Sequence, residues 1–280
     1  LNQLAFCEAS ALQLTRLAMS TRDFEALARN PFVQSVKFEA CSFTLESLIL
    51  ALESSTLNRI SMDMCVLNDH REAKIASPLG SRPLTLEIGA TKLDALSWSW
   101  LAVLPFESLH LRSLSIASGA TKNYLPSTLE SLDLVEVVVN DQDLKRLTTS
   151  QVLDGLFCYA SHISTNSLLP ILQCNTLAAL SLELTVVGED MMLSLQHSPS
   201  LSYMSFYRSH LPESWPVHLA RLSNLRTLNL SCTLVSTSEV GRITAEIEGL
   251  RLINIAGCPN ITKNDIEALK VGAPHCEFVY

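Results

Sequence analysis

The chain has 280 residues, of which 48% are hydrophobic and 17% charged, so it can bury a large core and is not a disordered segment. Its formal net charge of −8 offers no basic face of the kind that nucleic-acid-binding proteins carry, which predicts no nucleic-acid partner. There is no run of about 18 apolar residues and no signal-peptide pattern, so we expect no membrane span and no membrane partner. Because the chain begins with Leu1, we expect a fragment of a longer protein.

Eight cysteines are spread along the chain without any CxxC pair. In a chain of this length, scattered cysteines are typical of buried free thiols in a reducing compartment, which predicts a cytoplasmic protein. They are Cys7, Cys41, Cys65, Cys158, Cys174, Cys232, Cys258 and Cys276.

Apolar residues recur along the chain in the phrase L-x-x-L-x-L, at intervals of 23 to 25 residues. We use the third apolar residue of each phrase as the marker of one unit. A register held along the whole chain predicts stacked supersecondary units, about eleven of them, with a partial twelfth that ends at Tyr280. The markers are Leu14, Phe38, Met62, Leu86, Leu111, Leu134, Cys158, Leu182, Phe206, Leu230 and Ile255.

The first half of each unit has the pattern of a short strand. Leu228 and Leu230 alternate, which points both side chains into the core, and Leu225 covers the turn before them. Three residues past the marker, Ser, Thr or Cys offers a hydroxyl or thiol to backbone groups that become buried at the bend. Five residues past the marker an apolar side chain turns inward again: Phe43, Leu67, Val187, Leu211 and Val235.

The second half of each unit has the pattern of a helix. Residues 236–239 form a capping box, and Val240, Ile243 and Ile247 then share one face. Residues 20–23 and 262–265 repeat this pattern before further apolar residues. By contrast, the pairs Leu125-Pro126 and Trp215-Pro216 predict short or broken helices.

These units resemble the leucine-rich repeat family over essentially the whole chain. The resemblance is weakest before residue 9 and between about 81 and 128, where Ser81 replaces the expected leucine. The last full unit, 250–269, resembles the cysteine-containing, ribonuclease-inhibitor-like subclass, and Cys41, Cys65 and Cys258 hold the subclass cysteine. The resemblance implies one α/β domain over 1–280, a right-handed horseshoe of about eleven 24-residue repeats. Its parallel sheet would line the concave face and its helices the convex face, because single units cannot bury a core alone.

Chemistry-bearing motifs are sparse. Asp69-His70 has no nucleophile beside it, and Cys158 and His162 lie on either side of a strand exit. His275-Cys276 fits the closing of the last repeat, and no GxGxxG or P-loop pattern occurs. We therefore predict no catalytic residues, no metal, no cofactor and no enzymatic activity.

Three acids are predicted to form a column on the outward face of the sheet, one past the marker: Glu39, Asp63 and Glu87, followed by Arg112. Like charges on adjacent strands destabilise a sheet. One interpretation is a solvated face that Arg112 partly compensates, with Lys37 and Arg59 diluting the charge; the other is a docking strip for a basic segment.

Further along the chain, four of the fourteen Phe and Tyr residues fall on outward positions of two nearly adjacent strands. One interpretation is a contact surface, because Tyr and Arg are enriched at binding hot spots. The other is purely structural, because aromatic residues form strands well. We favour a contact surface that comprises Phe157, Tyr159, Glu183, Tyr203, Tyr207 and Arg208.

Together these patterns predict a non-catalytic scaffold that binds a protein or peptide, one with a basic segment as an option, on its concave sheet. The aromatic residues would supply apolar area, and the predicted charged contacts would fix the partner's orientation: Glu183, Arg208, Glu39, Asp63 and Glu87. Two alternatives follow from the resemblance: the substrate-recognition part of an F-box-type ubiquitin ligase subunit, and a regulatory repeat region of a larger enzyme. The same scaffold serves many partners, so the fold alone does not choose among them.

Overall fold

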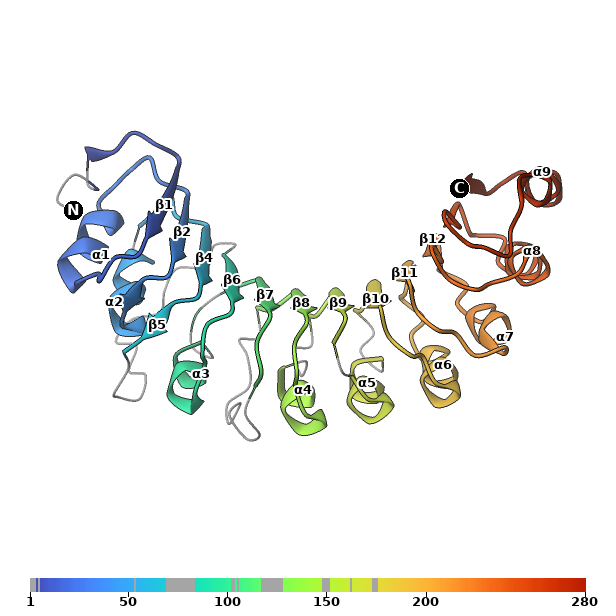
Figure 1. Ribbon diagram of the computed structural model, residues 1–280, viewed down its shortest axis with the longest axis horizontal. Coiled ribbons are helices and arrows are strands. Elements are labelled where there is room, and N and C mark those ends of the chain that lie inside the picture. The colour runs from blue at the N-terminus through green and yellow to red at the C-terminus, as the bar shows by residue number, and fades with distance from the viewer. Residues whose placement is uncertain are drawn as a thin grey trace. The chain divides into compact units, whose positions relative to one another are not determined.

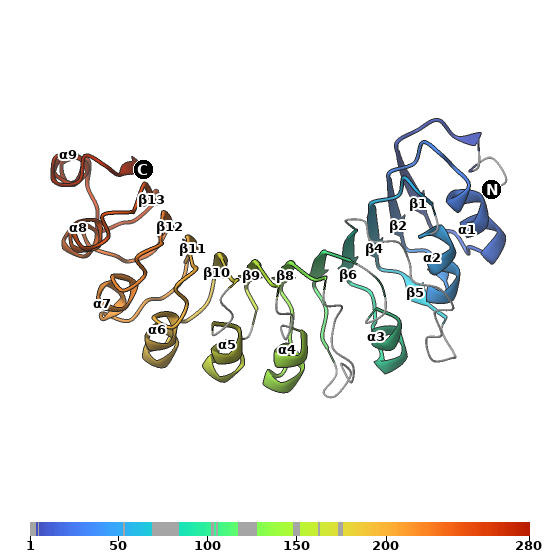
Figure 2. The same cartoon turned by 180° about the vertical axis from the view of Figure 1, so that it is seen from behind.

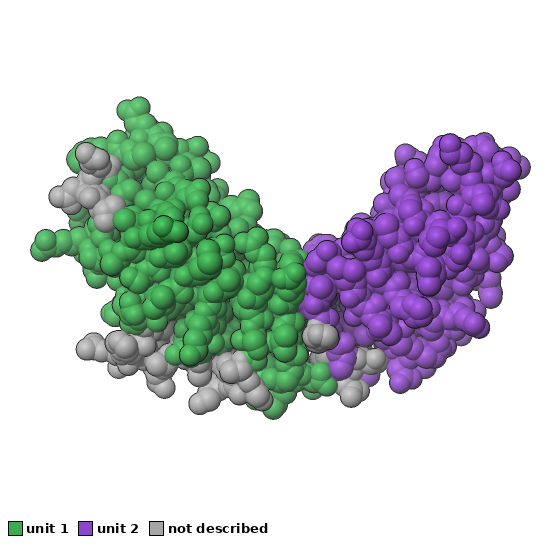
Figure 3. All heavy atoms as spheres, viewed as in Figure 1, with its two compact units in different colours: residues 1–152 green, residues 153–280 purple. Residues whose placement is uncertain are grey.

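The computed structural model describes residues 4, 6–52, 54–68, 84–101, 104, 106–116, 128–147, 152–161, 163–172 and 176–280. The chain divides into two compact units, residues 1–152 and residues 153–280 (Figure 3). The expected single domain over 1–280 stays a prediction.

Unit 1 alternates strands with helices, and its strands pair in parallel in chain order. Figure 1 shows its helices on one side of its sheet. A second, two-stranded sheet lies just past the main strands. The main strands are β1 (Ala11–Thr15), β2 (Ser35–Glu39), β4 (Arg59–Asp63), β6 (Thr85–Gly89), β7 (Ser108–Arg112) and β8 (Ser131–Val135); the small sheet is β3 (Ser42–Phe43) with β5 (Val66–Leu67); the helices are α1 (Thr21–Ala28), α2 (Leu45–Ala51), α3 (Ala95–Leu101) and α4 (Asp141–Leu147).

Unit 2 repeats the arrangement, with its helices again on one side of its strands (Figures 1 and 2). None of the described helices of unit 2 lies on the opposite face of the sheet, and we name that face the exposed sheet face. The strands are β9 (Gly155–Tyr159), β10 (Ala179–Glu183), β11 (Tyr203–Ser205), β12 (Thr227–Asn229), β13 (Leu252–Asn254) and β14 (Glu277–Val279); the helices are α5 (Thr165–Leu172), α6 (Glu189–Leu195), α7 (Trp215–Leu219), α8 (Thr237–Glu246) and α9 (Lys263–Gly272).

The leucine phrase forms the core, as the sequence predicts. Leu225, Leu228 and Leu230 are each fully buried, and Leu228 pairs with Met204 on one side and Ile253 on the other. Five past the marker, Phe43, Val187 and Val235 are buried, whereas Leu67 and Leu211 are half-buried. The fold is therefore an α/β leucine-rich repeat solenoid, in which successive repeats of about 24 residues bury each other's apolar faces.

One predicted marker is wrong. Met62 pairs with Ile88, and Leu86 pairs with Ile60. The marker of this repeat is therefore Ile88, and it lies 26 residues after the marker Met62. Apolar and polar residues alternate over 84–88, and the three apolar side chains, Leu84, Leu86 and Ile88, are all buried. Because side chains in a strand alternate with period two, a slip of two residues keeps the same face inward, and the pattern alone could not fix the register.

Where each strand ends, the residue two past the marker has a left-handed backbone. Ten such residues with side chains have φ between 43° and 58°, from Arg16 to Cys232, and Gly257 has φ 71°. In several repeats the side chain of the next residue donates a hydrogen bond to the preceding repeat. Cys41 Sγ donates to the Leu14 carbonyl at 3.2 Å, and Ser209 Oγ to the Leu182 carbonyl at 2.7 Å. This confirms the predicted role of hydroxyls and thiols at the bend.

The helix starts are also confirmed. In α8 the Ser236 backbone N–H donates to Glu239 Oε2 at 2.7 Å, and α1 and α9 begin with equivalent capping boxes. Helix α7 has only five residues, with Pro216 in its first turn, as the sequence predicts. Leu125-Pro126 lies outside the described residues.

Gly257→Ala should lower the free energy of unfolding by about 1–2 kcal/mol, because a left-handed backbone strains a residue with a side chain. A Cβ there would also lie 2.9 Å from Cys232 Sγ. Urea denaturation followed by circular dichroism measures the change. Gly272→Ala is the control, since its Cβ would meet nothing within 4 Å; an equal stability of the Gly257→Ala protein and its parent would contradict the strain.

The cysteine thiols should differ in reactivity. Burial raises the pKa of Cys276 to about 11 and also raises the pKa of Cys65, whereas Cys232 is exposed. At pH 8 about one Cys276 thiol in a thousand is then ionised, and the thiolate is the reactive form. Iodoacetamide followed by peptide mass spectrometry should label Cys232 well before Cys276 and Cys65. Equal rates for the three sites would contradict this order.

Candidate partner-binding surface

The predicted contact residues of unit 2 come together on three neighbouring strands. Tyr159 on β9 pairs directly with Glu183 on β10. Tyr207 follows β11 at the next equivalent position, where its carbonyl accepts a hydrogen bond from the Leu184 N–H at 2.9 Å. We name these three residues the Tyr–Glu–Tyr row. Both tyrosines and the glutamate are half-buried, so each keeps part of its side chain open to solvent.

Strand β10 presents small side chains between two strands that present aromatic ones. Its outward residues before Glu183 are Ala179, which pairs with Tyr203, and Ser181, which pairs with Phe157. The ring of Phe157 lies over Gly155, where an added Cβ would sit 2.7 Å from Phe157 Cε2. We name the four aromatic residues the aromatic patch: Phe157, Tyr159, Tyr203 and Tyr207.

The carboxylate of Glu183 is held by hydroxyl groups. Ser181 Oγ donates to Glu183 Oε1 at 2.9 Å, and Ser205 Oγ donates to the same oxygen at 2.6 Å. Ser205 is fully buried and Ser181 nearly so. Both bonds stabilise the ionised carboxylate and fix its orientation on the face.

The donors to this carboxylate are themselves fixed. Asn229 Nδ2 donates to Ser205 Oγ at 3.1 Å, so the single hydroxyl proton of Ser205 is free to point to Glu183. Asn229 Oδ1 in turn accepts from the Ser231 N–H at 3.1 Å and from Ser231 Oγ at 2.6 Å. A chain of hydrogen bonds with one direction therefore runs across β12 and β11 and ends at Glu183.

Arg208 lies at the edge of this surface. It is exposed, has φ 53°, and its guanidinium carbon lies 5.2 Å from the centroid of the Tyr207 ring. This is a cation–π distance, so one tyrosine of the row already holds a cation from its own chain.

The acids of unit 1 are arranged differently. Glu39 and Asp63 pair directly on β2 and β4, as the sequence predicts, but Asp63 pairs next with Gly89. Glu87 pairs with Ser61 and His110, so it belongs to the neighbouring row, and the predicted column is wrong at this residue. The two-residue register slip at β6 is the cause.

Each of these acids also has a basic partner. Asp63 Oδ2 lies 3.5 Å from the Arg112 guanidinium, and Glu39 Oε2 lies 3.9 Å from Lys37 Nζ. Arg59 Nε donates to Glu87 Oε1 at 2.9 Å. The geometry favours the solvated, compensated interpretation of the acidic residues over an open anionic strip.

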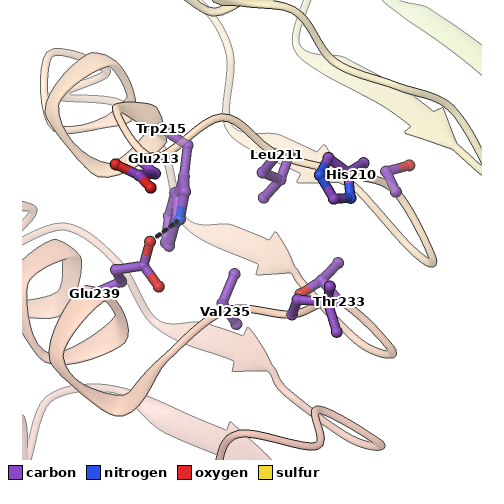
Figure 4. Close-up of a pocket in the computed structure, with 9 residues that line it drawn as sticks. His210, Leu211, Glu213, Trp215, Thr233, Val235 and Glu239 are labelled. Carbon is purple, nitrogen blue, oxygen red and sulfur yellow. Dashed lines mark hydrogen bonds between the residues drawn. The ribbon is translucent and has the colours of Figure 1, made fainter.

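A pocket of about 210 Å³ lies between the repeats of β11 and β12 (Figure 4). Trp215 Nε1 donates to Glu239 Oε1 at 3.1 Å, and the other oxygen of Glu239 serves the α8 capping box. The hydroxyls of Ser209 and Thr233 donate to backbone carbonyls. These polar groups already have hydrogen-bond partners within the protein, so we interpret the pocket as a gap in the packing between two repeats. The exposed polar side chains on its lining are those of His210 and Glu213.

A serine, a histidine and a glutamate also meet where α6 and α7 adjoin, which the sequence did not suggest. Ser214 Oγ donates to Glu189 Oε2 at 2.6 Å, and His218 Nε2 lies 3.3 Å from Glu189 Oε1. These hydrogen bonds lower the pKa of Glu189. Serine and histidine both contact the carboxylate rather than each other, so no activated nucleophile results.

Within the described parts of the chain, no group of three or more His, Cys, Asp or Glu side chains could hold a metal ion. None of the helices in those parts is long and apolar enough to span a membrane. Asp69, His70 and His162 lie outside the described residues.

No protein-family model matches the sequence. No curated protein matches it either. Among solved structures, the chain is similar to an internalin (inlF) from Listeria monocytogenes, with a TM-score of 0.57 and 13% identity over 96% of this chain and 73% of that one. It is also similar to TLR13 in a TLR13–ssRNA13 complex, with a TM-score of 0.56 and 16% identity over 96% of this chain. This chain spans 38% of the TLR13 chain, and at such identities both likenesses show the fold alone.

Ser205→Ala should lower the free energy of unfolding by about 1–2 kcal/mol, because it removes a donor to Glu183 and leaves the Asn229 amide without its acceptor. Chemical denaturation measures the loss. Ser223→Ala, at an exposed serine of the same unit, should stay within about 0.5 kcal/mol of the parent. Equal small effects at both positions would show that the hydrogen-bond chain adds nothing to stability.

Proposed function

We propose that the chain is a non-catalytic recognition scaffold that binds a protein or peptide partner on the exposed sheet face of unit 2. The observation that carries the proposal is the aromatic patch on β9 and β11, whose four side chains are half-buried while small residues of β10 lie between them. Partly exposed aromatic rings in one cluster provide apolar area that a partner can cover.

The rigidity of the surface supports the same function. The patch stands on paired strands, since β9 pairs with β10 and both β10 and β11 are paired on each side, and Glu183 is oriented by two hydroxyl donors. A preformed surface loses little conformational entropy when a partner binds, so more of the contact energy becomes affinity.

Nucleic acid is the contrasting candidate, because the TLR13 neighbour is a complex with ssRNA13. The net charge of −8 and a carboxylate at the centre of the surface both oppose phosphate groups. We therefore place a protein or peptide ahead of nucleic acid and propose no membrane partner.

We further propose that the repeats belong to the cysteine-containing subclass and that the protein is cytoplasmic. Cys41 and Cys258 donate to the carbonyl of the preceding marker, at 3.2 Å and 3.1 Å, which supports the cysteine-containing repeat subclass. The seven described cysteines are all free thiols, which supports a reducing, cytoplasmic compartment. A role as the receptor part of a ubiquitin ligase or as a regulatory region of an enzyme would follow from the partner that is captured.

Replacing Tyr159, Tyr203 and Tyr207 together with alanine should abolish capture of the partner from source-cell extract. One hot-spot tyrosine contributes about 2 kcal/mol, or about thirtyfold in affinity, so three exceed the range of a pull-down. Quantitative mass spectrometry of proteins bound to immobilised parent and variant measures the loss, with circular dichroism to confirm folding.

The matched control changes three exposed residues on the helices of the same unit, Arg242, Glu246 and Val271, to alanine. This control should capture the same protein as the parent. Capture that survives the tyrosine changes and fails with the helix changes would place the contact on the helices and refute the proposal.

A further inference from the structure

We infer that the Tyr–Glu–Tyr row is a site for a basic side chain, an arginine or lysine of the partner, which would lie over Glu183 between Tyr159 and Tyr207. The inference deepens the proposed function and rests on it, since it assigns the chemistry of the group that the surface receives.

Glu183 differs from the three acids of unit 1 in its partners. Glu39, Asp63 and Glu87 each form an ion pair with Lys37, Arg112 or Arg59 on the same sheet. Within the described residues Glu183 takes part in no ion pair, and its described partners are the hydroxyls of Ser181 and Ser205. The chain thus orients this carboxylate and leaves its counter-charge to be supplied from outside.

The oxygen atoms of Glu183 are used unequally. Both serine hydroxyls donate to Oε1, so Oε2 is left for a donor that approaches from solvent. A carboxylate accepts about two hydrogen bonds on each oxygen, which leaves room for the N–H of a guanidinium or an ammonium. Such charge-assisted bonds are shorter and stronger than those between neutral groups.

The tyrosines on either side are placed to stabilise the same charge. Adjacent strands lie about 4.8 Å apart, so a cation centred over β10 lies about 5 Å laterally from the strand that carries each tyrosine. Attraction between a cation and an aromatic face acts within about 6 Å of the ring centroid. A group over Glu183 therefore lies between the two flanking strands that lead to Tyr159 and Tyr207, at a lateral distance from each strand that is shorter than the reach of a cation–π contact.

The chain itself demonstrates the chemistry at one of these rings. The guanidinium of Arg208 lies 5.2 Å from the centroid of Tyr207, yet Arg208 forms no ion pair with Glu183 in the described structure. Arg208 thus shows that the ring receives a cation and leaves the carboxylate open. Its own charge opposes a second cation nearby, which gives the site a residue whose removal should strengthen binding.

The test uses the parent chain labelled with 3-fluorotyrosine and follows it by ¹⁹F NMR. The sequence has five tyrosines, and single Tyr→Phe variants assign the resonances. Tyr280 is the internal reference because Lys270 Nζ already lies 4.8 Å from its ring centroid. The probes are the blocked tripeptides Gly-Arg-Gly and Gly-Lys-Gly. Their neutral controls carry citrulline in place of arginine and acetyl-lysine in place of lysine.

We expect saturable shifts of the Tyr159 and Tyr207 resonances with a basic tripeptide, and at least about tenfold weaker binding of its neutral control. The arginine and lysine arms show which cation binds more tightly. Glu183→Gln keeps an oxygen for the two serines and should weaken binding about tenfold. Arg208→Ala should bind at least as tightly as the parent. Equal binding of the neutral peptides, an unchanged affinity of Glu183→Gln, or parallel shifts of Tyr280 would overturn the inference.

The same Glu183→Gln protein separates this inference from the proposed function. In the extract experiment, a partner lost with the three tyrosines but retained by Glu183→Gln would support the recognition surface and refute the cation site. A partner retained by the tyrosine variant, together with a charge-selective peptide response, would support the cation site and refute the aromatic patch as the main contact.

Discussion

The parallel register between successive strands is the constraint on which the rest of the structure depends. Each repeat contributes one short strand, and its apolar side chains are buried because equivalent apolar side chains flank them, as Leu228 is flanked by Met204 and Ile253. Side chains alternate along a strand, so the register that buries one set also chooses the set that faces outward. Tyr159 is level with Glu183 because Cys158 is level with Leu182 in the core. The candidate surface is thus a consequence of core packing.

The strand exits keep this register from one unit to the next. In each full repeat the chain leaves the strand through a residue with a left-handed backbone. Each of these residues except Gly257 carries a side chain. Such a residue costs about 1 kcal/mol, and where the side chain of the following residue donates to the preceding repeat, that hydrogen bond offsets about as much. Ser209 and Cys258 both make this bond, to Leu182 and Leu230. The repeated exit aligns Arg208 and its equivalents at one edge of the sheet.

Much of this architecture could be predicted from the sequence because its causes are local. The markers, the inward residues and the capping boxes at Ser20, Ser236 and Thr262 depend on spacing within one unit. The register at Leu86 could not, because Leu84, Leu86 and Ile88 satisfy the same face in either alignment. The left-handed exits also carry no signal, since residues such as Ala40 and Leu184 stand where glycine would announce the turn.

The candidate site divides in the same way. The outward positions of Phe157, Tyr159, Tyr203 and Tyr207 follow from the markers alone. The hydrogen bonds from Ser181, Ser205 and Asn229 depend on rotamers of residues about 24 positions apart, which no pattern in one unit encodes. The ion pairs of Asp63 and Glu87 depend on which base comes level with each acid, so the error at Leu86 carried directly into the acidic column.

The contrast between the two sheet faces indicates what the Tyr–Glu–Tyr row can discriminate. In unit 1 each of the three acids has a basic partner, within β2 for Glu39 and across strands for Asp63 and Glu87, which leaves a solvated face with little selectivity for charge. In unit 2 the carboxylate lies among aromatic rings, where a partner that covers it removes its water. Covering Glu183 with a neutral side chain would leave a buried charge without its counter-charge, at a cost of several kcal/mol, whereas a basic side chain avoids that cost. The same carboxylate that attracts one class of partner therefore rejects the others, so its contribution is to specificity more than to affinity.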